Sequence, residues 1–298
     1  MSATSRSLTR QTWGVVKQNP YLLLFPVTAA ALGTVVVLIV IGAGMGILGF
    51  STASADLAAA ADGGNLPTST KVIGIVVFVL AAYLGTLITQ VCMGGLVHCA
   101  DQELQGRDSS FGEGMGAALG KLPHLIGWAA IQTAVGWLLS LIQGNGGDNI
   151  VVNILRLVLA TLASVAWSVI TFFVLPMIML RDKGPIEAIK ASVSLIRSTW
   201  GMQIRGGVRI GIVIALLGIL PGFVALLGGF YFLFAEKYAV GVPLITLGVV
   251  VILIAQILIS ALRAVFSVAL LHYAEDGSAI GPFGTDELAA AVTTKTKK

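Results

Sequence analysis

Six long apolar runs limit what this sequence can fold into. They cover residues 21–50, 72–98, 125–142, 150–180, 206–234 and 242–273. A helix needs roughly 20 apolar residues to cross a hydrocarbon core of about 30 Å. All the runs except 125–142 reach that length, and the short one contains Gln132 and Thr133. The mean hydropathy of +0.94 agrees, so the sequence predicts an all-α, polytopic transmembrane bundle of six spans.

Lys and Arg are concentrated in alternate loops. They precede the first run, separate the second from the third and the fourth from the fifth, and follow the sixth, whereas the other loops contain only Lys71 and Lys237. Cytoplasmic loops carry the excess of Lys and Arg. The pattern predicts a multi-pass protein of the bacterial plasma membrane with both termini in the cytoplasm. The net charge of +4 follows from this topology, and no nucleic-acid partner is expected.

The runs divide the chain into three parts. Residues 1–20 form a cytoplasmic amphipathic segment, 21–273 the six-span domain and 274–298 a weakly ordered cytoplasmic tail. A signal peptide is the alternative for the N-terminus, with Ala53-Ser54-Ala55 as the cleavage site. The apolar stretch is too long for a signal-peptide core, which favours an uncleaved first span. The Ala-, Ser- and Gly-rich residues 51–70 are expected to be flexible.

Short amphipathic helices are predicted before the odd-numbered spans, at residues 8–17, 111–122 and 185–200. In the second, Ser110 and Glu113 match a capping box. In the third, Arg197 lies on the polar side, and the spacing of apolar residues by three and four places one helical face over Ile186, Ile189, Val193, Ile196 and Trp200. Such helices lie at the headgroups of a membrane. The unit of interfacial helix, span, outer turn and span is thus used three times.

Small residues form a stripe along the fifth span. They are Gly207, Gly211, Ala215, Gly218, Gly222, Ala225 and Gly229. A stripe of this kind permits close approach of helices in lipid, either within one chain or between copies in a homo-oligomer. Pro176 and Pro221 are expected to kink the fourth and fifth spans.

A few polar residues interrupt the apolar runs. Arg156 and Arg263 lie inside the fourth and sixth runs, where an arginine either binds a solute or extends to lipid headgroups. Gln256 shares a helical face with Arg263, and Gln90 and Gln132 are further polar insertions. These residues line a polar cavity, contact lipid headgroups or form hydrogen bonds between helices. The runs contain no Asp or Glu, which disfavours an ion-coupled pump.

No pattern of catalysis or ligand binding is found. The sequence has no P-loop, no nucleophile elbow and no paired-carboxylate motif, so an enzyme is not expected. His98, His124 and His272 lack the spacing of metal ligands, and no metal or cofactor is predicted. Cys92 and Cys99 are seven residues apart on one helix, which disfavours a disulfide and predicts two buried thiols.

Three groups of residues carry a family resemblance. They are Trp13-Gly14 with Asn19-Pro20 and Phe25-Pro26, then Trp167 with Thr171-Phe172-Phe173-Val174-Leu175-Pro176, and finally Arg181-Asp182-Lys183-Gly184-Pro185 with Trp200-Gly201. Together they resemble an uncharacterised family of six-span bacterial membrane proteins, frequent in actinobacteria. More distantly, the layout is similar to the membrane domain attached to some glycerophosphodiester phosphodiesterases. The resemblance implies no catalytic residues.

Two functions fit these observations better than an embedded enzyme does. The first is a non-enzymatic protein that organises or regulates membrane or envelope components through contacts with anionic lipids and with membrane proteins, including copies of itself. The second is a channel or facilitator for a small or lipid-like solute. A continuous polar cavity through the bundle favours the second function, and a sealed apolar bundle favours the first.

Overall fold

The computed structural model describes residues 3–61, 65–143, 150–200, 207–277 and 280–284, and every regular element there is helical. This confirms the all-α prediction. In chain order the elements are α1 (Ala3–Gln18), the 3-10 helix η1 (Pro20–Leu23), α2 (Leu24–Leu48), α3 (Phe50–Ala61), α4 (Thr68–Leu104), α5 (Phe111–Gly120), α6 (Leu122–Gln143), α7 (Ile150–Ile170), α8 (Val174–Arg181), α9 (Pro185–Trp200), α10 (Gly207–Phe234) and α11 (Tyr238–Asp276).

Five helical segments of the described chain are long and apolar enough to cross a membrane. They are Pro20–Leu48, Thr68–Leu104, Leu122–Ile142, Ile150–Arg181 and Tyr238–Asp276. The fifth predicted span forms α10, whose side chains are described only from Leu220 onward, and the described part, Leu220–Phe234, is a shorter apolar helix. The structure therefore shows a membrane-embedded helical protein with five candidate spans where the sequence predicts six.

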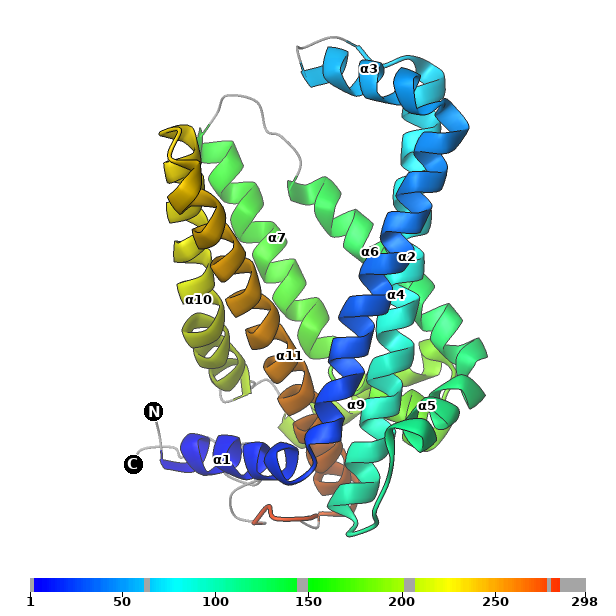
Figure 1. The fold of residues 1–298 in the computed structure, drawn as a ribbon. Coiled ribbons are helices and arrows are strands. Elements are labelled where there is room, and N and C mark those ends of the chain that lie inside the picture. The colour runs from blue at the N-terminus through cyan, green and yellow to red at the C-terminus, as the bar shows by residue number, and fades with distance from the viewer. Residues whose placement is uncertain (1–2, 62–64, 144–149, 201–206, 278–279, 285–298) are drawn as a thin grey trace.

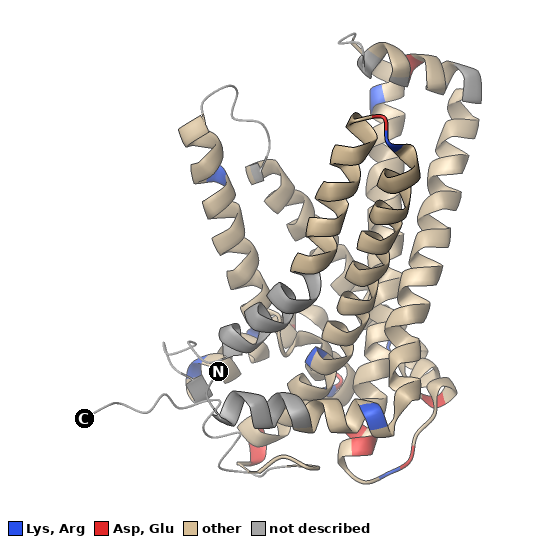
Figure 2. Cartoon of the chain, turned by 60° about the vertical axis from the view of Figure 1, so that its left-hand side comes forward, with Lys and Arg blue, Asp and Glu red and all other residues tan. Residues whose placement is uncertain are grey.

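Three helix pairs diverge from a common base (Figure 1). They are α2 with α4, α6 with α7, and α10 with α11. Helices α1, α5 and α9 lie at the base, and most charged residues gather there, so we call it the charged end (Figure 2). The main core lies at this end and includes Phe25, Leu96, Trp128 and Phe173. Away from it, large apolar side chains are exposed on every pair, as lipid-facing helices require.

The two basal helices α5 and α9 begin where the sequence predicts. The Ser110 hydroxyl accepts a hydrogen bond from the backbone N–H of Glu113, whose side chain accepts one from the Ser110 N–H, which confirms the capping box. Helix α9 has the predicted bounds but turns a different face inward. Ala188 and Ser192 are fully buried, whereas Ile186 is 63% exposed.

The remaining members of the predicted apolar face of α9 take several positions. Ile196 is buried, Ile189 is half-buried against the core, and Val193 is half-buried. Arg197 is exposed as expected, and the side chain of Trp200 lies outside the described residues. The buried face is therefore centred on small residues because these let α9 approach the bundle closely.

The prediction of a flexible segment at residues 51–70 is wrong where helices form, at 51–61 and 68–70, and residues 62–64 lie outside the described residues. The first part of the segment forms α3, and the Thr70 hydroxyl, in the first turn of α4, donates a hydrogen bond to the Asp56 carboxylate at 2.6 Å. Alanine has the highest intrinsic helix propensity, and it dominates α3.

Glycines bring α10 and α11 into close contact. A Cβ added to Gly222 would lie 2.9 Å from the carbonyl oxygen of Gly248, and one added to Gly229 would lie 3.0 Å from that of Gly241. Because the partner numbers fall as the α10 numbers rise, the two helices run antiparallel. The described part of the predicted stripe thus packs within the chain. The surroundings of Gly207, Gly211 and Gly218 lie outside the described residues.

The fourth apolar run is interrupted between α7 and α8. Residues 171–173 form a turn, α8 begins at Val174, and Pro176 in its first turn has no N–H to donate. The predicted kink at Pro176 is thus a complete break, whereas α10 continues through Pro221. The buried Ser192 hydroxyl of α9 donates to the Ile170 carbonyl at 2.5 Å and accepts from the Phe173 N–H at 3.4 Å. One hydroxyl therefore satisfies two backbone groups released by the break.

We expect Ser192→Ala to lower the free energy of unfolding by about 1–3 kcal/mol, because it leaves a buried carbonyl and a buried N–H without this partner. Thermal unfolding of the purified protein in detergent, followed by circular dichroism, measures the effect. Ser194→Ala, an exposed change on the same helix, is the matched control. Equal melting temperatures for the two variants would contradict this role of Ser192.

Candidate functional site

A cavity of about 410 Å³ lies where the helix pairs diverge. Residues of α2, α4, α6, α11 and the α7–α8 junction line it. Much of the lining is apolar, including Pro26, Met93 and Ile257. The polar residues of the lining are Thr89, Gln90, Gln132, Thr171, Gln256, Ser260, Arg263 and Ser267. The break between α7 and α8 contributes Thr171 and Phe172, so the irregular backbone lies beside this cavity, where such backbone is tolerated in membrane proteins.

Four of the five polar residues predicted from the sequence meet at this cavity. Gln90 comes from α4, Gln132 from α6, and Gln256 and Arg263 from α11. Arg156 lies on α7 and is half-buried, but it does not line the cavity. The structure therefore joins positions more than 170 residues apart in one site and separates the two intramembrane arginines.

Two glutamines of the site are also bonded to tryptophans. The Trp128 indole donates to the Gln90 amide oxygen at 3.2 Å, and the Trp167 indole donates to the Gln132 amide oxygen at 2.8 Å. The two indoles stack with their centroids 6.2 Å apart. The polar insertions thus serve as hydrogen bonds between helices and as cavity lining. Their amide N–H groups donate to no described residue, so they remain available to a ligand.

Arg263 is held across the bundle by α7. Its Nη2 donates to the Ser168 hydroxyl at 3.0 Å and to the Ser168 carbonyl at 3.2 Å. The guanidinium carbon lies 5.7 Å from the centroid of the Phe172 ring, within the range of a cation–π contact. The side chain therefore reaches a neighbouring helix and the cavity.

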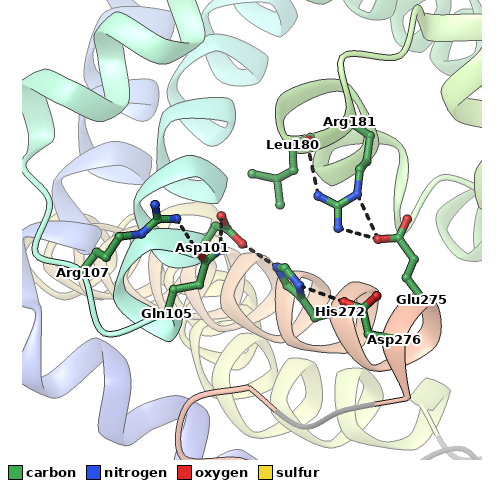
Figure 3. A network of polar contacts seen from close by, with 8 residues as sticks. All are labelled: Asp101, Gln105, Arg107, Leu180, Arg181, His272, Glu275 and Asp276. Carbon is green, nitrogen blue, oxygen red and sulfur yellow. Dashed lines mark hydrogen bonds and ion pairs between the residues drawn. The ribbon is translucent and has the colours of Figure 1, made fainter.

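A polar network ties the helix ends together below the cavity, at the charged end (Figure 3). His272 of α11 lies 2.6 Å from the Asp101 carboxylate of α4, to which Gln105 also donates. Arg181 at the end of α8 pairs with Glu275 of α11, at 2.5 Å from Nη2 and 3.0 Å from Nε. These contacts and the core above them close this end of the bundle.

A second ion pair joins the loops beside α9. The Lys121 ammonium lies 2.6 Å from the Asp182 carboxylate, where Asp182 has a positive φ of 53°. The hydrogen bond and the charge of Lys121 lower the pKa of Asp182 below its usual value. Because the Asp182 side chain is 65% exposed, solvent screens this pair, and it orients the loop more than it stabilises the fold.

Some features of the site carry no sequence signal. The tryptophan partners of Gln90 and Gln132 lie 38 and 35 residues away on other helices, and no spacing rule connects them. His272, which lacks the sequence spacing of a metal ligand, contacts Asp101. The position of His272 at the end of the sixth apolar run, and of Asp101 just after the second run, is the one sequence signal for this contact. Within the described ranges, no group of three His, Cys, Asp or Glu residues is arranged to hold a metal, and Cys92 and Cys99 are free and buried as predicted.

Comparison with known proteins gives a family but no activity. A search of curated proteins finds no match. The sequence profile of a family of unknown function, DUF6159, matches residues 70–281. That range extends from α4 past the end of α11 and includes every element that lines the cavity except α2. Because the match covers well over half of the chain, the protein belongs to the DUF6159 family of unknown function.

Proposed function

We propose that this protein is a non-enzymatic, six-span protein of the bacterial plasma membrane that binds a lipid-like solute in its cavity. Through this solute and through protein contacts it organises or regulates membrane or envelope components. The observation that carries the proposal is the cavity itself, which has one polar side and apolar walls. A ligand with a polar end and an apolar body matches both parts.

The cavity is accessible from the side of the bundle. Ala30 of α2 and Leu253 of α11 both line it and are exposed, so it opens between these two helices. In a membrane, a lateral opening faces lipid. Between the cavity and the charged end, the bundle is filled by core residues such as Phe173 and Val97. A solute that enters from the bilayer therefore meets the cavity directly.

A channel or facilitator for a small or lipid-like solute is the second candidate. Its support is the row of polar side chains, Gln256, Ser260, Arg263 and Ser267, along one face of α11 inside the cavity. Passage through the membrane would additionally require the core and the Asp101–His272 contact at the charged end to open. The binding function needs no such movement and is therefore preferred.

Two observations support the six-span arrangement. One is the packing of α10 against α11, and the other is the position of the Lys and Arg residues. Antiparallel packing of α10 against α11 gives the pair the same form as α2 with α4, and Lys and Arg gather at the end that carries α1, α5 and α9. We place this end in the cytoplasm, where the basal helices meet anionic headgroups. A homo-oligomer or another membrane protein is the protein partner. The actinobacterial distribution and the similarity to phosphodiesterase membrane domains remain part of this proposal.

Single-cysteine labelling tests the topology, in a background where Cys92 and Cys99 are replaced by alanine. Ala58→Cys on α3 and Glu236→Cys in the α10–α11 turn should react with a membrane-impermeant maleimide on intact cells. Lys190→Cys on α9 should react only after permeabilisation. Protection of Glu236→Cys in intact cells would show that α10 does not cross the membrane, and labelling of Lys190→Cys from outside would invert the orientation.

Filling the cavity should displace the bound solute. We expect Ala30→Trp to reduce the amount of lipid retained by the purified protein, as counted by native mass spectrometry, because the indole occupies the space beside α11. Leu253→Trp should act in the same way from the opposite wall.

Neighbouring substitutions provide the controls. Ala31→Trp and Ile254→Trp change exposed residues of the same helices that do not line the cavity, so they should retain lipid as the wild type does. If both cavity variants melt normally and keep the wild-type number of lipids, the proposed binding function is wrong.

A further inference from the structure

The cavity contains one charge, and that charge has no acidic partner. Among the described residues that line the cavity, Arg263 is the only charged one. No described Asp or Glu forms an ion pair with it, and its hydrogen bonds go to the neutral Ser168. The Arg263 side chain is exposed at the cavity, so its charge is open to any counter-charge that enters. A ligand with a negative group would therefore be drawn to this end of the cavity.

The free donors of Arg263 fit an oxyanion. Both hydrogen bonds to Ser168 use Nη2, and neither Nε nor Nη1 donates to a described residue. A guanidinium presents its donors in a planar fork that matches the oxygens of a phosphate or carboxylate. The Gln256 side chain lies seven residues earlier on the same face of α11, is exposed and lines the cavity. Its amide offers further donors to the same ligand.

The remainder of the cavity fits an acyl chain. On α11 the lining extends from Leu253 to Ser267, a length of about 20 Å at 1.5 Å per residue. Met93, Leu253 and Ile257 make this part of the wall apolar. A free inorganic anion would use only the Arg263 end and leave the apolar wall without a ligand. The described lining contains no carboxylate, so no opposite charge there pairs with the cationic group of a choline or ethanolamine headgroup.

We infer that the cavity binds an anionic phospholipid, with its phosphate on Arg263 and an acyl chain along α11 toward Leu253. This inference rests on the proposed function, because it names the class of lipid-like solute that the cavity holds. Ser168 and Phe172 position the guanidinium, and the amides of Gln90, Gln132 and Gln256 provide neutral hydrogen bonds around the headgroup.

Competition between two phospholipids tests the inference. The full-length protein is incubated in detergent with equimolar phosphatidylglycerol and phosphatidylcholine of the same acyl chains, and retained lipids are counted by native mass spectrometry. Both headgroups carry the phosphate that would contact Arg263, but the choline cation of phosphatidylcholine repels the guanidinium and meets no carboxylate in the lining. The wild type should therefore retain phosphatidylglycerol about tenfold over phosphatidylcholine. Arg263→Gln should bring the ratio to about one, and Arg263→Lys should keep a reduced preference because the cation remains. Arg156→Gln changes the arginine outside the cavity and should match the wild type.

Inorganic phosphate distinguishes a lipid from a free anion. The melting temperature of the lipid-free protein should rise with phosphatidylglycerol and not with millimolar inorganic phosphate. An equal rise with phosphate that Arg263→Gln abolishes would overturn the lipid assignment.

The wild-type preference is measured without any variant, so a folding defect of Arg263→Gln cannot hide the result. Retention of both lipids without preference would overturn the assignment of an anionic headgroup but would leave the proposed function intact. Retention of neither lipid would overturn both.

Discussion

Helices in lipid gain little from burying apolar surface against one another, so this bundle depends on close packing and on internal hydrogen bonds. The contact of α10 with α11 is an example of close packing. Gly222 lies so close to Gly248, and Gly229 to Gly241, that an added Cβ would meet a carbonyl oxygen. Ser192 is an example of an internal hydrogen-bonding group. Its hydroxyl completes the backbone hydrogen bonding at the break between α7 and α8, where water is not available to do so.

The same requirement explains the polar cavity. An arginine inside a transmembrane helix is costly, by about 2.5–3.5 kcal/mol when it lies at the helix centre, and here α7 supplies Ser168 to hold Arg263. The bonds of Gln90 and Gln132 to Trp128 and Trp167 likewise join α4 to α6 and α6 to α7. Gln90, Gln132 and Arg263 therefore each link two helices at the point where the pairs diverge. Because they converge there, they also form the polar side of a cavity whose other walls are apolar.

The elements that follow from local sequence were predictable. Long apolar runs fixed the position of the main helices, and the capping box at Ser110 fixed the start of α5, because both signals lie within a few residues of the structure they specify. The bounds of α9 follow from Pro185 and the spacing of its apolar residues. Its inward face did not follow, since close approach to the bundle favours the small Ala188 and Ser192 over the larger Ile186.

The site was predictable in its residue types but not in its geometry. Polar residues inside apolar runs are few, so Gln90, Gln132, Gln256 and Arg263 stood out. Nothing in the sequence separates Arg263 from Arg156, because whether an arginine faces a cavity depends on how its helix is rotated against distant neighbours. The Asp101–His272 contact, 171 residues apart in the chain, is set in the same way by the packing of α4 against α11.

A structure determined by electron microscopy in nanodiscs that contain phosphatidylglycerol tests the central claim most directly. The claim is that the helix pairs diverge around a cavity that receives a lipid at Arg263. The account predicts elongated density between α2 and α11, with its head within hydrogen-bond distance of the Arg263 guanidinium. Helix pairs that close against one another and leave no density beside Arg263 would contradict it.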